Sequence, residues 1–188
     1  MTNEFRCLVF AVITGFLALL AQAYSGGSGT ETDPYQIANK ADLLYLGTNT
    51  TDYSKHFIMT ADVDLVGEVF NRAMVAPDLS SAWLLQGTAF TGVFDGGGCV
   101  ISNLLIDSTS EGSDYIGLFG YNRGVICDLS VVNINMIGGY LQANYTGGMC
   151  GYNDCGVISN CFVQGVLESS SASMTPFEKV FERQGLGS

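Results

Sequence analysis

Two stretches of the sequence decide the fold: GLFGYNRGVICDLSV at residues 117–131 and GMCGYNDCGVISNCFV at residues 148–163. They align with Tyr121 on Tyr152, and the offset of 31 residues becomes 32 after the extra residue Cys155. Recurrence at a spacing of about 20–50 residues is typical of chains whose repeats stack on one another. The sequence therefore predicts a stacked repeat array.

A third stretch, GVFDGGGCVISNLLI at residues 92–106, resembles the first when shifted by 25 residues, which aligns Gly92 with Gly117. This alignment predicts two apolar columns: Ile101, Ile126 and Ile158 in one, and Leu104, Leu129 and Cys161 in the other. It also predicts stacked corner residues: the glycines Gly98, Gly124 and Gly156, and an amide ladder of Asn122 and Asn153.

The repeats are of the β type. Each unit holds two short runs of strand-forming residues separated by Gly or Asn, and no run of about ten residues shows a helical period. One rung cannot bury its apolar side alone, so rungs must stack, with strands about 4.8 Å apart. We therefore expect an all-β chain with a β-solenoid domain over residues 34–168.

The segments before the repeats show local patterns of their own. Asn39 is placed to cap a helix over residues 39–47, with Asp42 completing a capping box and Gly47 ending the helix. In HFIMTADVDL, alternation predicts one continuous strand. Its inward face would carry Phe57, Met59, Ala61, Val63 and Leu65. Residues 24–33 are expected to be a linker, and residues 66–91 an irregular excursion or long loop.

Solenoid ends need covers, because an open rung is a bare strand edge. The helix at residues 39–47 would cover the first rung. Residues 169–188 are expected to form a capping helix or a tail, since Thr175, Pro176 and Glu178 resemble a helix start.

Residues 1–23 resemble an export signal. A single cation, Arg6, precedes the apolar run 7–20, and Ala21-Gln22-Ala23 offers small residues for cleavage near Ala23. The alternative is an uncleaved anchor. We expect a secreted or cell-surface protein with no membrane span in the mature chain.

Five cysteines follow the signal: Cys99, Cys127, Cys150, Cys155 and Cys161. An odd number leaves at least one thiol outside any internal disulfide. Two readings remain open, one real bridge or several small buried thiols. No CxxC occurs and His56 is the single histidine, so no metal site or cofactor is expected on this basis.

Charge excludes one class of partner. The 188 residues hold 7 Lys and Arg against 18 Asp and Glu, a net charge of -11. A nucleic-acid-binding surface needs clustered cations, which this chain lacks. An acidic surface favours carbohydrate, divalent cations or basic partners.

Several strings together resemble a known family. GLFG at 117–120 and GMCG at 148–151, each followed by YN, resemble the GLUG-motif repeats of secreted and cell-surface bacterial proteins. The upstream strings at residues 27–47, 56–65 and 90–106 resemble the segments that precede such repeats. The resemblance covers about residues 26–168 and implies a right-handed parallel β-helix. The metallopeptidase activity found beside some such repeats is not implied, since no HExxH occurs.

Carboxylates are the candidate catalytic or calcium-binding groups. Asp62 and Asp64 project from one side of the predicted strand, about 6.5–7 Å apart. Asp95 lies in the glycine-rich bend FDGGG. Such residues can hold calcium or act as an acid/base pair. The simpler interpretation is a solvated strand face and a turn-forming aspartate.

Tyrosines are the candidate sugar-binding groups. If Tyr121 and Tyr152 stack outward on successive rungs, they form a platform suited to sugar rings. The sequence thus favours a non-enzymatic surface module for adhesion or for binding carbohydrate or protein. The alternatives are a polysaccharide hydrolase or lyase using the carboxylates, and a truncated, non-functional fragment of a larger surface protein.

Overall fold

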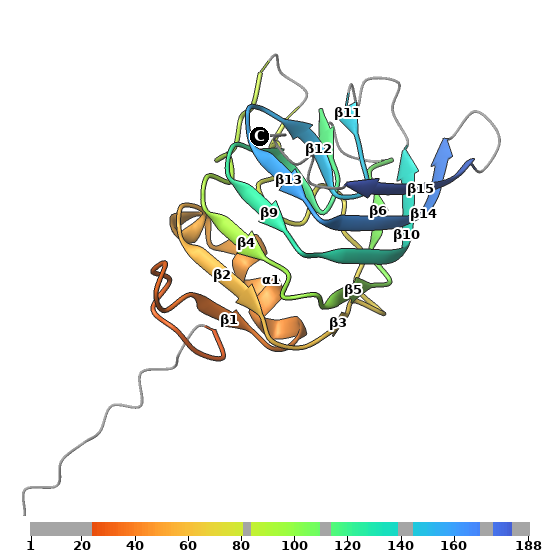
Figure 1. Ribbon diagram of the computed structural model, residues 1–188. Coiled ribbons are helices and arrows are strands. Elements are labelled where there is room, and N and C mark those ends of the chain that lie inside the picture. The colour runs from red at the N-terminus through yellow and green to blue at the C-terminus, as the bar shows by residue number, and fades with distance from the viewer. Residues whose placement is uncertain (1–23, 81–83, 110–113, 139–144, 170–174, 182–188) are drawn as a thin grey trace, which may run out of the picture.

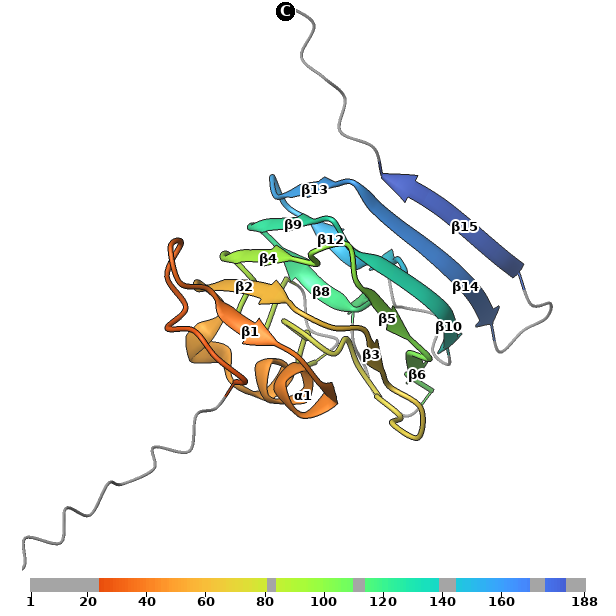
Figure 2. The same cartoon turned by 60° about the horizontal axis from the view of Figure 1, so that its bottom comes forward.

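The computed structural model describes residues 24–80, 84–109, 114–138, 145–169 and 175–181. The segment expected to be an export signal lies outside these residues. The described chain is all-β apart from helix α1 (Lys40–Thr48) and the single 3-10 turn η1 (Thr50–Asp52). Most of its strands pair in parallel, in layers that lie one above another (Figures 1 and 2).

The strands form three sets, and each set runs from layer to layer along the stack. One sheet runs, in order, through β1 (Tyr35–Ile37), β2 (His56–Met59), β4 (Val93–Asp95), β9 (Val125–Cys127) and β13 (Val157–Ser159). A second follows the path β15 (Thr175–Phe181), β14 (Cys161–Ser169), β10 (Ser130–Gly138), β5 (Val100–Ser102) and β3 (Val63–Asp64), with β6 (Leu105–Asp107) also on β10. The third set comprises two pairs: β7 (Tyr115–Ile116) with β11 (Tyr145–Thr146), and β8 (Phe119–Asn122) with β12 (Cys150–Asn153).

The offset between the last two repeats is confirmed. Tyr121 pairs with Tyr152 at 31 residues, and Ile126 pairs with Ile158 at 32. The Asn122 side-chain amide also donates to Asn153 Oδ1 at 2.8 Å, so the predicted amide ladder exists. This part of the register could be read correctly because no insertion separates the two copies of the motif apart from Cys155.

The first repeat is aligned differently from the prediction. Phe94, rather than Ile101, pairs with Ile126, while Ile101 pairs with Val131. The 25-residue shift was therefore wrong, and the true offsets are 32 and 30. Leu129 is buried and stands in register between Cys99 and Cys161, since the adjacent residue Ser130 pairs with both Val100 and Phe162. Leu104 belongs to the same buried core but to another register position.

The glycine corner is also corrected. Val93, Val125 and Val157 are in register, so the glycines before them, Gly92, Gly124 and Gly156, stack. A Cβ on Gly124 would lie 2.2 Å from Gly92 O, which no side chain tolerates. Gly98, predicted at this corner, instead has φ +76 and open space around it. Close backbone approach explains the glycines in the column, whereas backbone conformation explains Gly98.

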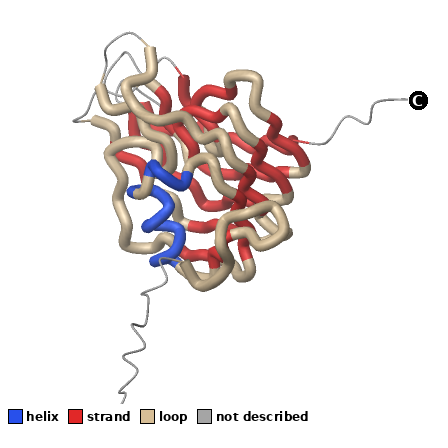
Figure 3. Tube along the Cα trace, turned by 90° about the vertical axis from the view of Figure 1, so that its left-hand side faces the viewer, coloured by secondary structure: helices blue, strands red, loops and turns tan. Residues whose placement is uncertain are grey.

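The N-terminal end of the stack is covered. Asn39 accepts a hydrogen bond from Asp42 N at 3.1 Å, as a helix cap should, and Leu43 and Leu46 are buried. The helix runs through Gly47 to Thr48, so the predicted stop is wrong by one residue. Gly47 allows close packing instead, because a Cβ there would meet Met74 O at 2.7 Å. Figure 3 shows α1 against one end of the strands.

Residues 24–33, expected to be a linker, belong to the folded unit. Tyr24 is buried, its ring lies 4.4 Å from that of Tyr35, and Gly26 bridges to Gln36. The predicted single strand at residues 56–65 is two strands. The chain turns at residues 60–62, and Ala61 is exposed while Met59 and Val63 stay buried. The predicted inward face is therefore wrong at Ala61 and correct at the four other positions, Phe57, Met59, Val63 and Leu65.

The excursion at residues 66–91 returns to the core. Phe70, Val75 and Phe90 form isolated parallel bridges to Ile106, Phe119 and Asn122. Phe90 and Val75 are fully buried. The described residues around Phe70, Val75 and Phe90 therefore belong to the layers.

The predicted C-terminal helix is a strand. Residues Thr175–Phe181 form β15, which pairs antiparallel with β14. The unpaired N–H and C=O groups along the edge of β14 offer a complete ladder, and these long-range bonds override a local helix-start pattern. Residues 170–174 and 182–188 lie outside the described part.

The register generates a stability prediction. Replacing Leu129 with Ala should lower the free energy of unfolding by about 2–5 kcal/mol, because it opens a cavity within a fully buried column. Replacing Val66, which is exposed, with Ala should change it by less than about 0.5 kcal/mol. Urea unfolding followed by circular dichroism measures both, and an equal effect of the two substitutions would contradict the assigned column.

Candidate functional site

Four tyrosines from the third set of strands form one cluster. The rings of Tyr121 and Tyr152 lie 5.2 Å apart, and those of Tyr145 and Tyr152 lie 4.9 Å apart. Tyr115 contacts the other three at 5.2 to 5.5 Å. Parallel pairing of β7 with β11 and of β8 with β12 brings these rings together, because it stacks Tyr115 on Tyr145 and Tyr121 on Tyr152. Hereafter this is the tyrosine cluster.

The cluster has a buried side and an exposed side. Tyr121 is 9% exposed and Tyr115 is buried, whereas Tyr145 is 44% exposed and Tyr152 is half-buried. The expected outward stacking is therefore correct for Tyr152 and wrong for Tyr121. Tyr121 supports the cluster from beneath, and Tyr145, which the sequence analysis did not select, supplies the most accessible ring.

An ion pair borders the cluster. Arg123 donates through Nε to Asp154 Oδ2 at 2.7 Å, and the Tyr121 hydroxyl donates to the same oxygen at 3.0 Å. The Arg123 guanidinium also lies 5.4 Å from the centre of the Tyr121 ring. The Arg123 hydrogen bond holds the pKa of Asp154 below its ordinary value, while burial, followed by Asp154, raises that of Tyr121.

This ion pair carried a readable signal. Arg123 and Asp154 each follow the Tyr-Asn pair of their repeat, at equivalent positions with opposite charges. Stacking of the repeats then places them side by side.

Behind the cluster lie two buried carboxylates. Asp78 is fully buried; its Oδ1 accepts from Gln86 N at 2.8 Å, and its Oδ2 accepts from Asp114 N at 3.2 Å. Burial, reinforced by the charge of Asp78, raises the pKa of Asp114. Sequence reasoning missed both residues because neither belongs to a repeated motif.

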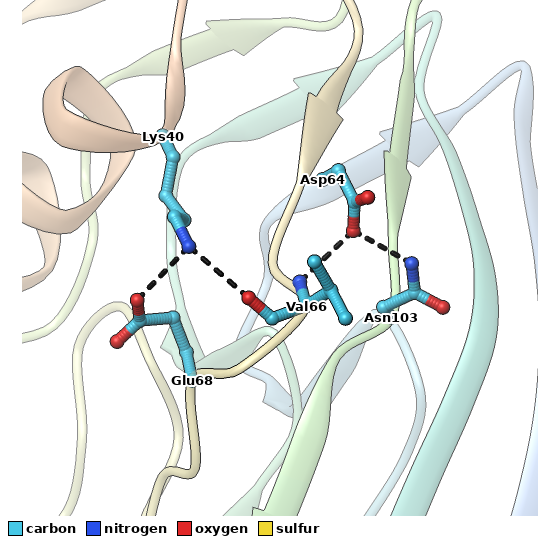
Figure 4. A network of polar contacts seen from close by, with 5 residues as sticks. All are labelled: Lys40, Asp64, Val66, Glu68 and Asn103. Carbon is cyan, nitrogen blue, oxygen red and sulfur yellow. Dashed lines mark hydrogen bonds and ion pairs between the residues drawn. The ribbon is translucent and has the colours of Figure 1, made fainter.

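The predicted carboxylates hold turns. Asp62 Oδ1 accepts from Val100 N at 2.8 Å. Asp64 Oδ1 accepts from Val66 N at 2.9 Å and from the Asn103 amide at 2.6 Å (Figure 4). The bond from Asn103 is the main reason that the pKa of Asp64 is lowered.

Asp64 also lies next to a contact between the helix and the excursion. Lys40 pairs with Glu68 at 3.0 Å and donates to Val66 O at 3.1 Å (Figure 4). The Oδ1 atom of Asn103 accepts in turn from the side-chain amide of Asn133 on the next layer. These contacts anchor the chain where it leaves the stack, which is a structural use of Asp64.

Asp95 lies in a different group. Its Oδ1 accepts from Gly97 N at 2.8 Å, and its carboxylate, Cys127 and the Asp128 carboxylate have ligand atoms within 4.8 Å of one another. Burial, then the charge of Asp95, raises the pKa of Cys127 to about 12. Calcium prefers oxygen ligands alone, so the Cys127 thiol does not suit it. Within the described residues this is the one such group, and it does not include Asp62 or Asp64.

The five cysteines of the described chain are free thiols. Burial is the main cause of the raised pKa of Cys99, Cys150 and Cys161. Cys155 alone among them is exposed. Only Cys161 is buried, and Cys99, Cys127 and Cys150 are partly exposed, so the expectation of several buried thiols holds for Cys161 alone.

Two curated proteins are similar to this chain. Halomucin from Haloquadratum walsbyi is 32% identical over 167 residues, which cover 79% of this chain and 2% of that protein. A protein described as a Gly-rich membrane protein, from Evansella cellulosilytica, is 31% identical over 175 residues, 85% of this chain and 18% of that protein. The chain therefore spans a small part of each relative.

No family model matches the chain, so the resemblance to GLUG-motif repeats stays a prediction. No solved structure matches it either. Among the helices that the structure describes, none is long and apolar enough to cross a membrane.

Substitution of Asp114 and of Asp154 should change the melting temperature in opposite directions, because the pKa of Asp114 is raised and that of Asp154 is lowered. Asp114 has a raised pKa, so its charge costs stability above that pKa and the cost disappears at low pH. Asp114→Asn should raise the melting temperature at pH 7 by about 2–5 °C, with the gain shrinking below about pH 4.

Asp154→Asn is the matched control. The pKa of Asp154 is lowered, so its ionised form stabilises the fold above the unfolded pKa, and that contribution is lost as the pH falls through the folded pKa. This variant should melt lower than the parent at pH 7, and the difference should also close in acid. Calorimetric scans from pH 3 to pH 7 measure both; a lower melting temperature for Asp114→Asn at pH 7 would contradict the assignment.

Thiol reactivity should divide the cysteines. Iodoacetamide at pH 8 should label Cys155 at least about tenfold faster than Cys150, because burial raises the pKa of Cys150 to about 12. Mass spectrometry of timed digests measures the rates. Cys155→Ser should remove the fast phase, and guanidinium should make the remaining rates equal. Fast labelling of Cys150 in the native protein would contradict the raised pKa of its thiol.

Proposed function

We propose that this chain is a surface-associated, non-enzymatic β-solenoid module that binds carbohydrate through the exposed side of the tyrosine cluster. The observation that carries the proposal is the arrangement of Tyr145 and Tyr152, whose rings lie 4.9 Å apart and inclined at 68°. Inclined aromatic rings present an apolar corner bordered by hydroxyl groups, which suits the C–H faces and hydroxyls of a sugar ring.

The stacked register supports the solenoid part of the proposal. Equivalent side chains recur at 30 to 32 residues in the last three layers, as a right-handed parallel β-helix of the GLUG-repeat type would require. The names of the two relatives, a mucin-like name and a membrane protein, support a place outside the cell, with residues 1–23 as the export signal.

The rim of the cluster favours a polar, neutral ligand. Arg123 and Asp154 neutralise each other, and the pKa of the Tyr115 hydroxyl is raised mainly by burial. The Tyr115 hydroxyl therefore remains a protonated donor. Asp62, Asp64 and Asp95 accept hydrogen bonds from turns, so their geometry offers no support for the alternative of a hydrolase or lyase.

A glycan array with the mature chain tests the proposal. Binding should be saturable, and the double variant Tyr145→Ala/Tyr152→Ala should weaken it at least about tenfold, because stacked aromatic contacts supply most of a neutral sugar's affinity. Tyr45→Ala is the matched control, since Tyr45 is also an exposed tyrosine but lies on α1. No binding to any glycan, or equal binding by both variants, would refute the proposed function.

A further inference from the structure

The two ends of the stack differ. At the first end, α1 packs against β1 and the Gly26–Gln36 bridge pairs with the β1 backbone. At the other end, β13 is the last strand of its sheet and β12 is the last strand of its pair (Figure 2). Within the described residues, only β14 of that last layer has a covering strand, β15.

Side chains of the last layer are less buried than their equivalents one layer below. Ile126 and Phe119 are fully buried, whereas Ile158 and Cys150, paired with them, are only half-buried. Val157 is 52% exposed. The loss of burial at matched positions shows how much cover another layer supplies.

A cavity of about 810 Å³ opens at this end. Its wall is formed by residues of β12, β13 and β14, by Thr146 of β11 with the segment that leads from it into β12, by Gly156 before β13, and by one residue of β10. None of the lining residues is charged: Met136, Thr146, Gly147, Gly148, Met149, Cys150, Gly151, Asn153, Gly156, Val157, Ile158, Val163 and Leu167. In a chain of net charge -11, an uncharged apolar wall suits an apolar occupant rather than an ion or a charged sugar.

We propose that this end receives an extended segment of another polypeptide, which adds in parallel to β12 and β13 and repeats their pattern. The cavity would hold the apolar residue that stacks on Ile158. Strand addition to an exposed edge is a recurrent mode of peptide recognition, in which backbone hydrogen bonds supply affinity and pockets supply specificity.

The register already present defines the partner segment. The Asn122–Asn153 ladder continues if the segment places an amide over Asn153. The stacked glycines continue if it places a glycine over Gly156, since a Cβ there would approach the neighbouring backbone too closely. The interface would thus extend the one between β8–β9 and β12–β13. This site borders the tyrosine cluster, because Tyr152 lies on β12, but the cavity lining contains no tyrosine. The proposal therefore goes beyond the sugar-binding function.

Residues 147–160 themselves supply the probe. The fluorescein-labelled peptide GGMSGYNDSGVISN carries that sequence with both cysteines replaced by serine. Fluorescence anisotropy against the mature full chain should show saturable binding with a Kd of about 10–100 µM, as expected for a small interface. A scrambled peptide should not bind.

Backbone N-methylation tests the mode of binding. Val157 N donates to Gly124 O at 2.8 Å, where Val157 pairs with Val125. Because N–H groups alternate in direction along a parallel strand, an added strand would turn the N–H at its copy of Ser159 toward the protein and that at its copy of Ile158 away. Methylation at the copy of Ser159 should weaken binding at least about tenfold, and methylation at the copy of Ile158 should change it little.

A substitution in the protein provides a second arm. Ile158→Glu should abolish binding by placing a charge in the cavity wall, whereas Val69→Glu, at a residue 64% exposed and outside the cavity lining, should not. Circular dichroism confirms that both variants are folded.

Three results would overturn the proposal: no binding of the parent peptide, equal binding of the two methylated peptides, or a stable dimer by light scattering that the peptide fails to dissociate. The last result would assign this end to a second copy of the chain. Ile158 lies outside the tyrosine cluster, so Ile158→Glu should abolish peptide binding and leave sugar binding unchanged. This variant distinguishes failure of the strand-addition proposal from failure of the sugar-binding proposal.

Discussion

Parallel backbone pairing in register is the constraint on which the rest of this structure depends. Val93, Val125 and Val157 are aligned, and this alignment sets the positions next to them. Aromatic and aliphatic side chains of successive layers then stack in the interior. The glycines before the valines lie in close backbone contact, and the Asn122 side chain donates a hydrogen bond to Asn153. Each layer is stabilised by the next, because none could bury its apolar side alone.

The same constraint builds the candidate site. Register brings Tyr115 to Tyr145, Tyr121 to Tyr152, and Arg123 to Asp154, although about 30 residues separate the members of each pair. Burial then differentiates the tyrosines, with two serving as the base of the cluster and two facing outward. The constraint also explains the unequal ends of the stack, since a ladder continues until a helix or an antiparallel strand covers it.

Part of this arrangement was readable from the sequence. The offset of 31 and 32 residues, the amide ladder and the helix cap at Asn39 were predicted correctly, because each rests on short uninterrupted motifs. The first repeat was misaligned because GVF at residue 92 resembles GLF at residue 117, whereas its backbone follows GVI at residue 124. Similar letters follow both Gly117 and Gly124, so the sequence alone does not show which of them aligns with Gly92. The backbone pairing of the strands shows that it is Gly124.

The sequence by itself determined the all-β class of the fold, the spacing of the last two repeats and the acidic character, since these follow from composition and from local period. Only the tertiary structure decided which layer each segment joins, that Tyr121 lies beneath the cluster, and that residues 66–91 return to the core. It also made a strand of residues 175–181, because an unsatisfied backbone edge outweighed a local helix signal. Burial and long-range hydrogen bonds depend on neighbours distant in the chain, which no local pattern encodes.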